Sequence, residues 1–99
     1  MENFNQAQID EGRVWAETEL RALAIERGVK LDHVVWTDSP QAKAWIVELT
    51  SAAGEHTISL SYEVLEKCAA DEHARFTLRE RLRGLVGDLA RIERRGHLR

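Results

Sequence analysis

Hydrophobic residues recur every three or four positions in the last third of the chain, and this is the strongest periodic pattern in the sequence. The stripe consists of Leu78, Leu82, Leu85, Leu89 and Ile92, with Val86 at its edge. Its spacing predicts a long amphipathic helix that Asp71 caps and Gly96 ends. A stripe of this length does not establish a coiled coil, and we expect the helix to pack across a β-sheet.

Another helix is predicted near the start of the chain, over residues 6–27. Asn5 is a suitable N-cap, and Gly28 supplies the left-handed residue that commonly ends a helix. Gly12 weakens the first turns, so Asp10 is an alternative N-cap. The N-terminal boundary is therefore the less well defined end of this helix.

Three β-strands are predicted between these helices, because β-branched and aromatic residues concentrate there and turn residues separate them. The expected spans are residues 30–37, 43–51 and 55–61. Pro40 and Gly54 lie in the two connections, which are short enough for antiparallel hairpins. A short helix over residues 61–70 then leads into the C-terminal helix.

Alternation along the strands assigns side chains to the two faces of the sheet. One face receives Ile58 and Leu60 from the third strand and Trp45, Val47 and Leu49 from the second. Ile46 then points to the opposite face. In the first strand, that opposite face receives either Trp36 with Val34 or Val35 with Leu31.

The sequence therefore predicts a single α+β domain over residues 1–99 in the order α-β-β-β-α. Its three-stranded antiparallel sheet is expected to carry the helices packed on one face. Residues 1–5 and 97–99 are expected to be loose ends. The predicted core consists of Leu20, Leu23, Val47, Leu49, Ile58, Leu60, Leu78, Leu82, Leu85 and Leu89.

The composition fits one small globular domain. With 99 residues, 43% hydrophobic and 31% charged, the chain is too apolar for a disordered tail and small for a deep catalytic cleft. Cys68 is the single cysteine and cannot form an internal disulfide, and the first residues lack the pattern of a secretory signal. No apolar run is long enough to span a bilayer. We therefore expect a cytoplasmic protein with no membrane partner.

Charge is distributed unevenly along the chain. Residues 75–99 carry eight arginines and three acidic residues, whereas the whole chain has a net charge of −3. On a helical projection, the arginines lie on both flanks of the leucine stripe. The residues expected to contact a partner here are Arg75, Arg79, Arg83, Arg91, Arg94 and Arg95.

The arginine cluster has three interpretations. Guanidinium groups bind phosphate and carboxylate through paired hydrogen bonds, so the partner is either nucleic acid or an acidic protein. Alternatively, the arginines pair with acidic residues of their own fold, such as Glu17, Glu19 and Glu63. Glu80 and Asp88 interrupt the basic surface, and the negative net charge weakens attraction to a polyanion.

Aromatic residues suggest a second candidate surface. Trp15, Trp36 and Trp45 are expected by default to pack in the core. If Trp36 and Ile46 both lie on the open face of the sheet, they form an apolar patch suited to a protein partner or to a symmetric homodimer. We therefore include Trp36 and Ile46 among the candidate partner-binding residues.

No motif for catalysis, for a cofactor or for a metal is recognisable. The histidines and Cys68 lack the close spacing of a zinc site, and no glycine-rich phosphate loop is present. Cys68 with His73 is the one candidate nucleophile and base, but the spacing of Cys68 from Val64 and Leu65 predicts a buried packing thiol. We predict no enzymatic activity, no cofactor and no small-molecule substrate.

The order α-β-β-β-α resembles that of double-stranded RNA-binding domains, over roughly residues 6–96 and in topology only. That family carries a lysine-rich start of the second long helix and a hairpin of the Gly-Pro-x-His type. Here Asp-Glu-His-Ala stands at residues 71–74 and Ser-Pro-Gln at residues 39–41. The residues that bind RNA in that family are thus missing, and topology by itself implies little about function.

The sequence favours a non-enzymatic protein-interaction module that associates with itself as a homodimer. It would offer the open sheet face and the arginine-rich helix flanks to its partner. The first alternative is a nucleic-acid-binding domain that uses the arginine-rich helix, and a small enzyme is the least favoured.

Overall fold

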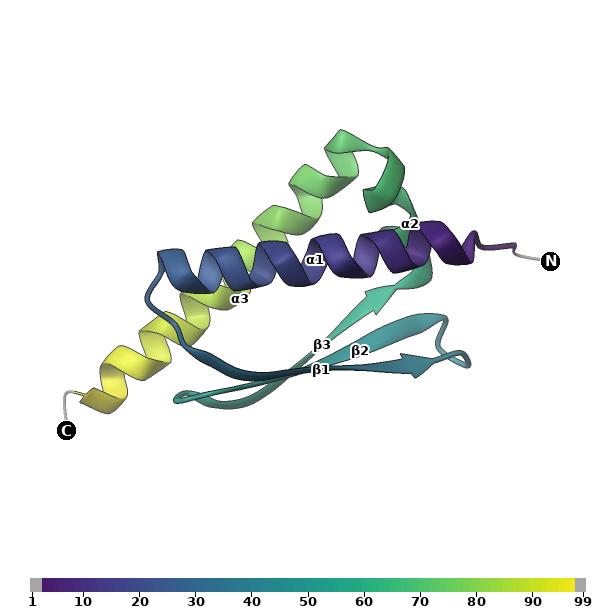
Figure 1. Cartoon of the computed structure of the whole chain (residues 1–99). Helices are drawn as coiled ribbons and strands as arrows, with labels where there is room; N and C mark the ends of the chain where they lie inside the picture. Colours follow the sequence, from purple (N-terminus) through teal and green to yellow (C-terminus); the bar gives the residue numbers. More distant parts are fainter. Residues whose placement is uncertain (1–2, 98–99) are drawn as a thin grey trace.

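The computed structural model describes residues 3–97, which form three helices and three strands (Figure 1). In chain order they are α1 (Gln6–Glu26), β1 (Leu31–Ser39), β2 (Ala44–Ser51), β3 (Gly54–Ser61), α2 (Tyr62–Ala70) and α3 (Glu72–His97). The strands form one antiparallel sheet in the order β1-β2-β3, and the helices lie on one side of it. The α+β fold class predicted from the sequence is confirmed.

α1 begins where the capping pattern places it. The side chain of Asn5 accepts a hydrogen bond from the backbone N–H of Gln8 at 3.1 Å, so the alternative cap Asp10 lies inside the helix. Gly12 is buried against α2. At the other end, Gly28 adopts a φ of 71°, the left-handed conformation expected of the residue that ends a helix.

A β-bulge in β1 decides which of its residues face the helices. The register with β2 shifts between Leu31 and His33, whereas Val34 and Trp36 pair regularly with residues of β2 that face the core. Because of the extra residue, Leu31, Val34 and Trp36 all pack toward the helices. Val35 points to the opposite face and is 50% exposed.

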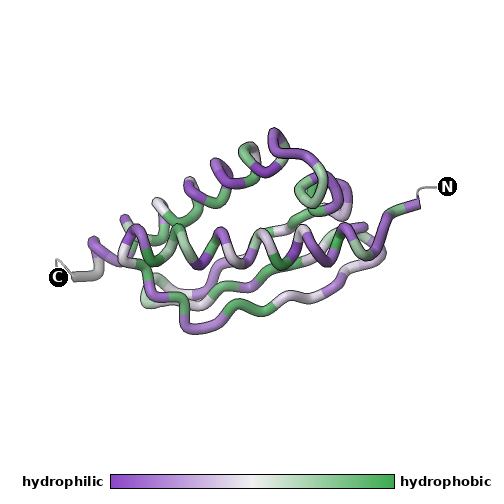
Figure 2. The backbone as a smooth tube through the Cα atoms, turned by 45° about the horizontal axis from the view of Figure 1, so that its top comes forward, coloured by the Kyte–Doolittle hydropathy of each residue, from purple (hydrophilic) through white to green (hydrophobic). Residues whose placement is uncertain are grey.

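The core lies between the helix layer and the sheet, and each helix alternates hydrophobic and hydrophilic positions along its length (Figure 2). Of the ten predicted core residues, eight are buried, and Ile58 and Leu85 are half-buried against them. On α3, Val86 is fully buried instead of lying at the edge, and Ile92 is 42% exposed. The buried stripe therefore follows the 3.6-residue period of a straight helix and drifts away from the leucine repeat.

The N-terminal end of the described chain contacts the rest of the domain. The ring of Phe4 packs edge-on against Tyr62 with centroids 5.5 Å apart, and the backbone N–H of Asn5 donates to Glu66 Oε2 at 2.6 Å. α3 continues through Gly96 to His97, one residue beyond its predicted end. The remaining terminal residues, 1–2 and 98–99, lie outside the described part. Within residues 3–97, no helix is both long and apolar enough to cross a membrane.

Candidate functional site

Two of the predicted partner-binding arginines form contacts inside the fold. Arg79 Nε donates to Glu19 Oε1 at 2.6 Å, and its guanidinium carbon lies 5.7 Å from the ring centroid of Trp15. Arg75 Nη1 donates to the carbonyl oxygen of Cys68 at 3.0 Å, near the end of α2, where helix carbonyls lack intrahelical partners. These side chains thus join α3 to α1 and to α2.

A third arginine of α3, Arg81, contacts the sheet. Its Nη2 donates to the carbonyl oxygen of Ser59 at 3.1 Å. Because β3 is an edge strand, this bond satisfies a backbone acceptor that would otherwise be free to pair with another chain. Of these three arginines, Arg79 pairs with an acidic residue of the fold, as one of the three interpretations of the arginine cluster expects, whereas Arg75 and Arg81 donate to backbone carbonyl oxygens.

Three further arginines of α3 meet Arg27, at the end of α1, in an open hollow of about 420 Å³ between the end of α1 and the middle of α3. We call this hollow the arginine groove; it is lined by Arg27, Glu80, Arg83, Gly84, Gly87, Asp88, Arg91 and Arg94. Arg83 Nε lies 3.8 Å from Glu80 Oε2, and Arg91 forms an ion pair with Asp88. Within the described residues, Arg27 and Arg94 form no ion pair. Arg95 is exposed and lies outside the lining.

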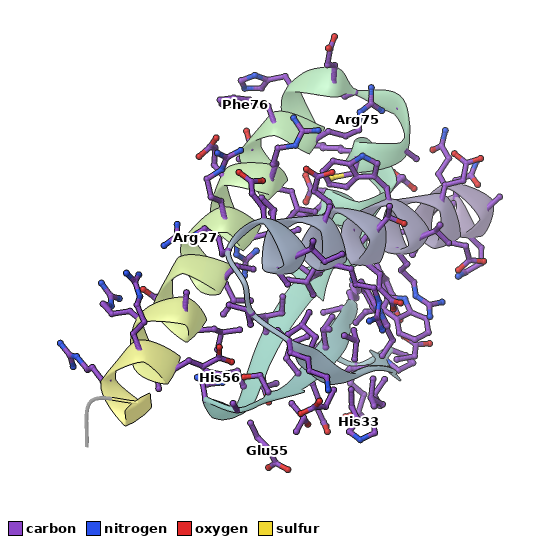
Figure 3. All side chains as sticks on the ribbon, turned by 60° about the vertical axis from the view of Figure 1, so that its left-hand side comes forward. Arg27, His33, Glu55, His56, Arg75 and Phe76 are labelled. Atoms are coloured by element: carbon purple, nitrogen blue, oxygen red, sulfur yellow. The ribbon has the colours of Figure 1, made fainter. Side chains whose placement is uncertain are left out.

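Arg27 was missed as a candidate from the sequence. It is the C-cap residue of α1, and its Nη1 lies 3.8 Å from the position that a Cβ atom on Gly87 would occupy (Figure 3). The sequence places Arg27 at the end of a helix but gives no indication that this end meets the middle of α3. The available signal is the spacing of Gly84 and Gly87, which leaves two positions without side chains on one side of α3.

The open face of the sheet is the second candidate surface. It is formed by His33, Val35, Thr37, Ile46, Glu48, Thr50, Glu55, Thr57 and Ser59, as the strand register shows. Figure 3 shows His33 and Glu55 projecting from the sheet away from the helices. Its large apolar residues are Val35, which is exposed, and Ile46, which is half-buried, and they come from neighbouring strands.

Trp36 does not share this surface with Ile46, so the predicted patch of these two residues is not formed. Trp36 pairs with the buried Val47 and lies on the helix side, because the β-bulge sets the alternation of β1. Its Nε1 donates to Glu17 Oε1 at 2.7 Å. The open face therefore carries Val35 of β1 in place of Trp36.

The tryptophans of the sheet form a cluster with Arg13 of α1. The guanidinium carbon of Arg13 lies 3.5 Å from the ring centroid of Trp45 and 5.4 Å from that of Trp36. The two rings meet edge to face with centroids 6.4 Å apart. This cation–π and aromatic packing attaches α1 to the sheet, in line with the expected core role of these tryptophans.

Cys68 is a packing residue in the structure. It is 1% exposed, and its Sγ donates to the carbonyl oxygen of Ala74 at 3.7 Å. Burial raises the pKa of this thiol, an effect that the positive charge of Arg75 only partly offsets. A thiolate nucleophile is therefore disfavoured, and no histidine accepts the thiol hydrogen among the described residues. That part of the chain also contains no group of three metal ligands.

Comparison with protein-family models, with curated proteins and with solved structures found no match for this chain.

Proposed function

We propose that this chain is a non-enzymatic interaction module that self-associates through the open face of its sheet. The observation that carries the proposal is the one-sided arrangement of the described elements. All three helices cover the same face, and Val35 and Ile46 stand on the other without a covering element. Burial of such apolar surface is the main driving force of protein association.

The polar residues of the open face make it self-complementary. His33, Thr50 and Glu55 form one row across the three strands, so the imidazole and the carboxylate lie at opposite ends of that row. A two-fold axis parallel to β2, between two sheets packed face to face, places His33 of one copy over Glu55 of the other. The same axis brings Ile46, on the middle strand, close to its own copy. A polyanion would bind this face poorly, because the carboxylates of Glu48 and Glu55 repel it.

The size of the face limits the affinity. Strand spacings of about 4.8 Å and rises of about 3.3 Å per residue make it roughly 14 by 26 Å. This is well below the area of about 800 Å² per partner that is typical of stable complexes. We therefore propose a weak homodimer with a dissociation constant on the order of micromolar or above.

The free and buried Cys68 supports a reducing environment, and we propose a cytoplasmic location on this ground. The nucleic-acid alternative is less well supported than the sequence indicated, because Arg75 and Arg79 are hydrogen-bonded inside the fold.

Sedimentation equilibrium over a wide concentration range tests the self-association. The Ile46→Glu variant places a charge at the centre of the proposed interface and should sediment as a monomer at every concentration. The matched control is Val14→Glu, an equal gain of charge at a residue of α1 that is 69% exposed. A wild-type protein that stays monomeric at millimolar concentration, or an equal effect of both variants, would refute the proposal.

A further inference from the structure

We infer that the arginine groove is a binding site for a small phosphorylated ligand. The groove is formed where Arg27, from the end of α1, lies beside Arg83, Arg91 and Arg94 of α3. Four guanidinium groups from two elements thus surround one hollow. Arg binds phosphate oxygens through its planar fork, which provides two parallel hydrogen bonds.

The charges of the groove match a compact anion. Glu80 and Asp88 pair with Arg83 and Arg91, which neutralises two of the four positive charges. Arg27 and Arg94 have no acidic partner among the described residues and leave the groove with a net positive charge. Because exposed ion pairs spaced three residues apart on a helix contribute little, Arg83 and Arg91 can exchange their carboxylates for a phosphate at small cost.

The floor of the groove allows a ligand to approach the helix closely. Gly84 and Gly87 have no side chains, and a Cβ atom built on Gly84 would meet no other atom within 4 Å. Both glycines sit well inside α3, where glycine costs roughly 1 kcal/mol relative to alanine. The volume of about 420 Å³ lies within the range of small-ligand sites.

A small ligand fits the groove better than nucleic acid does. A nucleic acid requires a continuous basic track, but Arg75, Arg79 and Arg81 on the same helix are hydrogen-bonded to other parts of the fold. The net charge of −3 also opposes long-range attraction of a polyanion. The groove lies in the helix layer and the open face on the far side of the sheet, so this inference does not depend on self-association.

Isothermal titration calorimetry of the full chain with pyrophosphate, at low and at physiological salt, tests the inference. The Arg27→Gln/Arg94→Gln variant removes the two unpaired guanidinium groups and should weaken binding at least about tenfold. The matched control is Arg21→Gln/Lys30→Gln, which makes the same change in net charge at two exposed residues outside the groove. The control should bind within about twofold of the wild type, since only screened long-range charge is lost.

Mapping of backbone amide chemical shifts by NMR provides a readout that does not depend on the variants. Pyrophosphate should shift the backbone amide resonances of Gly84 and Gly87 and leave those of the open face unchanged. Three results would overturn the inference: no binding to the wild type at low salt, equal losses in the two double variants, or binding of an oligonucleotide without binding of pyrophosphate. The last result would favour a nucleic-acid site instead. A groove that does not bind pyrophosphate leaves the monomer–dimer equilibrium unaffected, so the two proposals can be judged separately.

Discussion

Gly12 of α1 and Leu65 of α2 touch backbone to backbone. A Cβ atom at Gly12 would lie 2.1 Å from the carbonyl oxygen of Leu65, far closer than any non-bonded contact allows. The glycine that weakens α1 by its helix propensity therefore lies where the two helices are in close contact. The contact also explains why a helix can contain this glycine without an alternative start at Asp10.

Two glycine-to-alanine substitutions should consequently have opposite effects on stability. Gly12→Ala forces the helices apart and should lower the free energy of unfolding by at least about 2 kcal/mol. Gly84→Ala meets no other atom within 4 Å and should raise it by up to about 1 kcal/mol through higher helix propensity. Thermal unfolding of the two variants measures both effects. Equal and small shifts in Tm would contradict the close crossing of α1 and α2.

The contact between Arg79 and Glu19 should be measurable as a coupling energy. With 37% and 23% of the two side chains exposed, solvent screens the pair, and we expect a coupling of about 0.5–1 kcal/mol in a double-mutant cycle with alanine. The pair Arg83 and Glu80, which is 3.8 Å apart and about half exposed, serves as the control and should give less than about 0.3 kcal/mol. Indistinguishable couplings would mean that Arg79 does not join α3 to α1 in solution.

Tyr62 makes the stability of the protein sensitive to alkaline pH. Its hydroxyl donates to Asp38 Oδ1, and this hydrogen bond is the main cause that raises the pKa of Tyr62 above the usual 10.0. Because the folded-state pKa exceeds the unfolded one, the bond stabilises the fold below pH 10 and this contribution is lost as the pH rises through the folded-state pKa.

Tyr62 is the single tyrosine of the chain, so a spectrophotometric titration of tyrosinate reports this residue alone. We expect a midpoint above that of the unfolded protein, and Asp38→Asn should move it toward the unfolded value. A wild-type midpoint equal to that in denaturant would show that the hydrogen bond is absent.

Glu48 provides a test of the geometry proposed for the dimer. It lies on the middle strand two residues from Ile46, so the two-fold axis parallel to β2 brings it near its own copy. Relief of this repulsion is worth on the order of 1 kcal/mol, so Glu48→Gln should tighten self-association about fivefold. Thr57→Gln, which adds an amide side chain to the same face without removing a charge, is the control. Weaker association of the Glu48→Gln variant would exclude this axis.

Much of the fold could be predicted from local patterns. Asn5 and Gly28 define the ends of α1 through capping chemistry, and Val47 and Leu49 define the buried face of β2 through simple alternation. The orientation of Trp36 could not be predicted in this way, because alternation left two assignments of the first strand open. One extra residue between Leu31 and His33 places Leu31, Val34 and Trp36 on the same face, a combination that neither assignment contains.

The candidate surfaces depended on tertiary contacts that no local pattern contains. Glu19 was one of several acidic residues available to the arginines, and only the crossing of α1 and α3 selects it for Arg79. The same crossing brings Arg27 into the arginine groove from the far end of α1. Local sequence thus predicts which face of each helix is polar, whereas the packing of the helices decides which polar residues meet.

The most direct test of self-association through the open face is an isotope-filtered NOE experiment on a mixture of ¹³C-labelled and unlabelled protein. Our account predicts intermolecular NOEs that involve the methyl groups of Ile46 and Val35, at a protein concentration where sedimentation shows dimer. Intermolecular NOEs confined to residues of the helices, or a dimer without any NOE to Ile46, would contradict it.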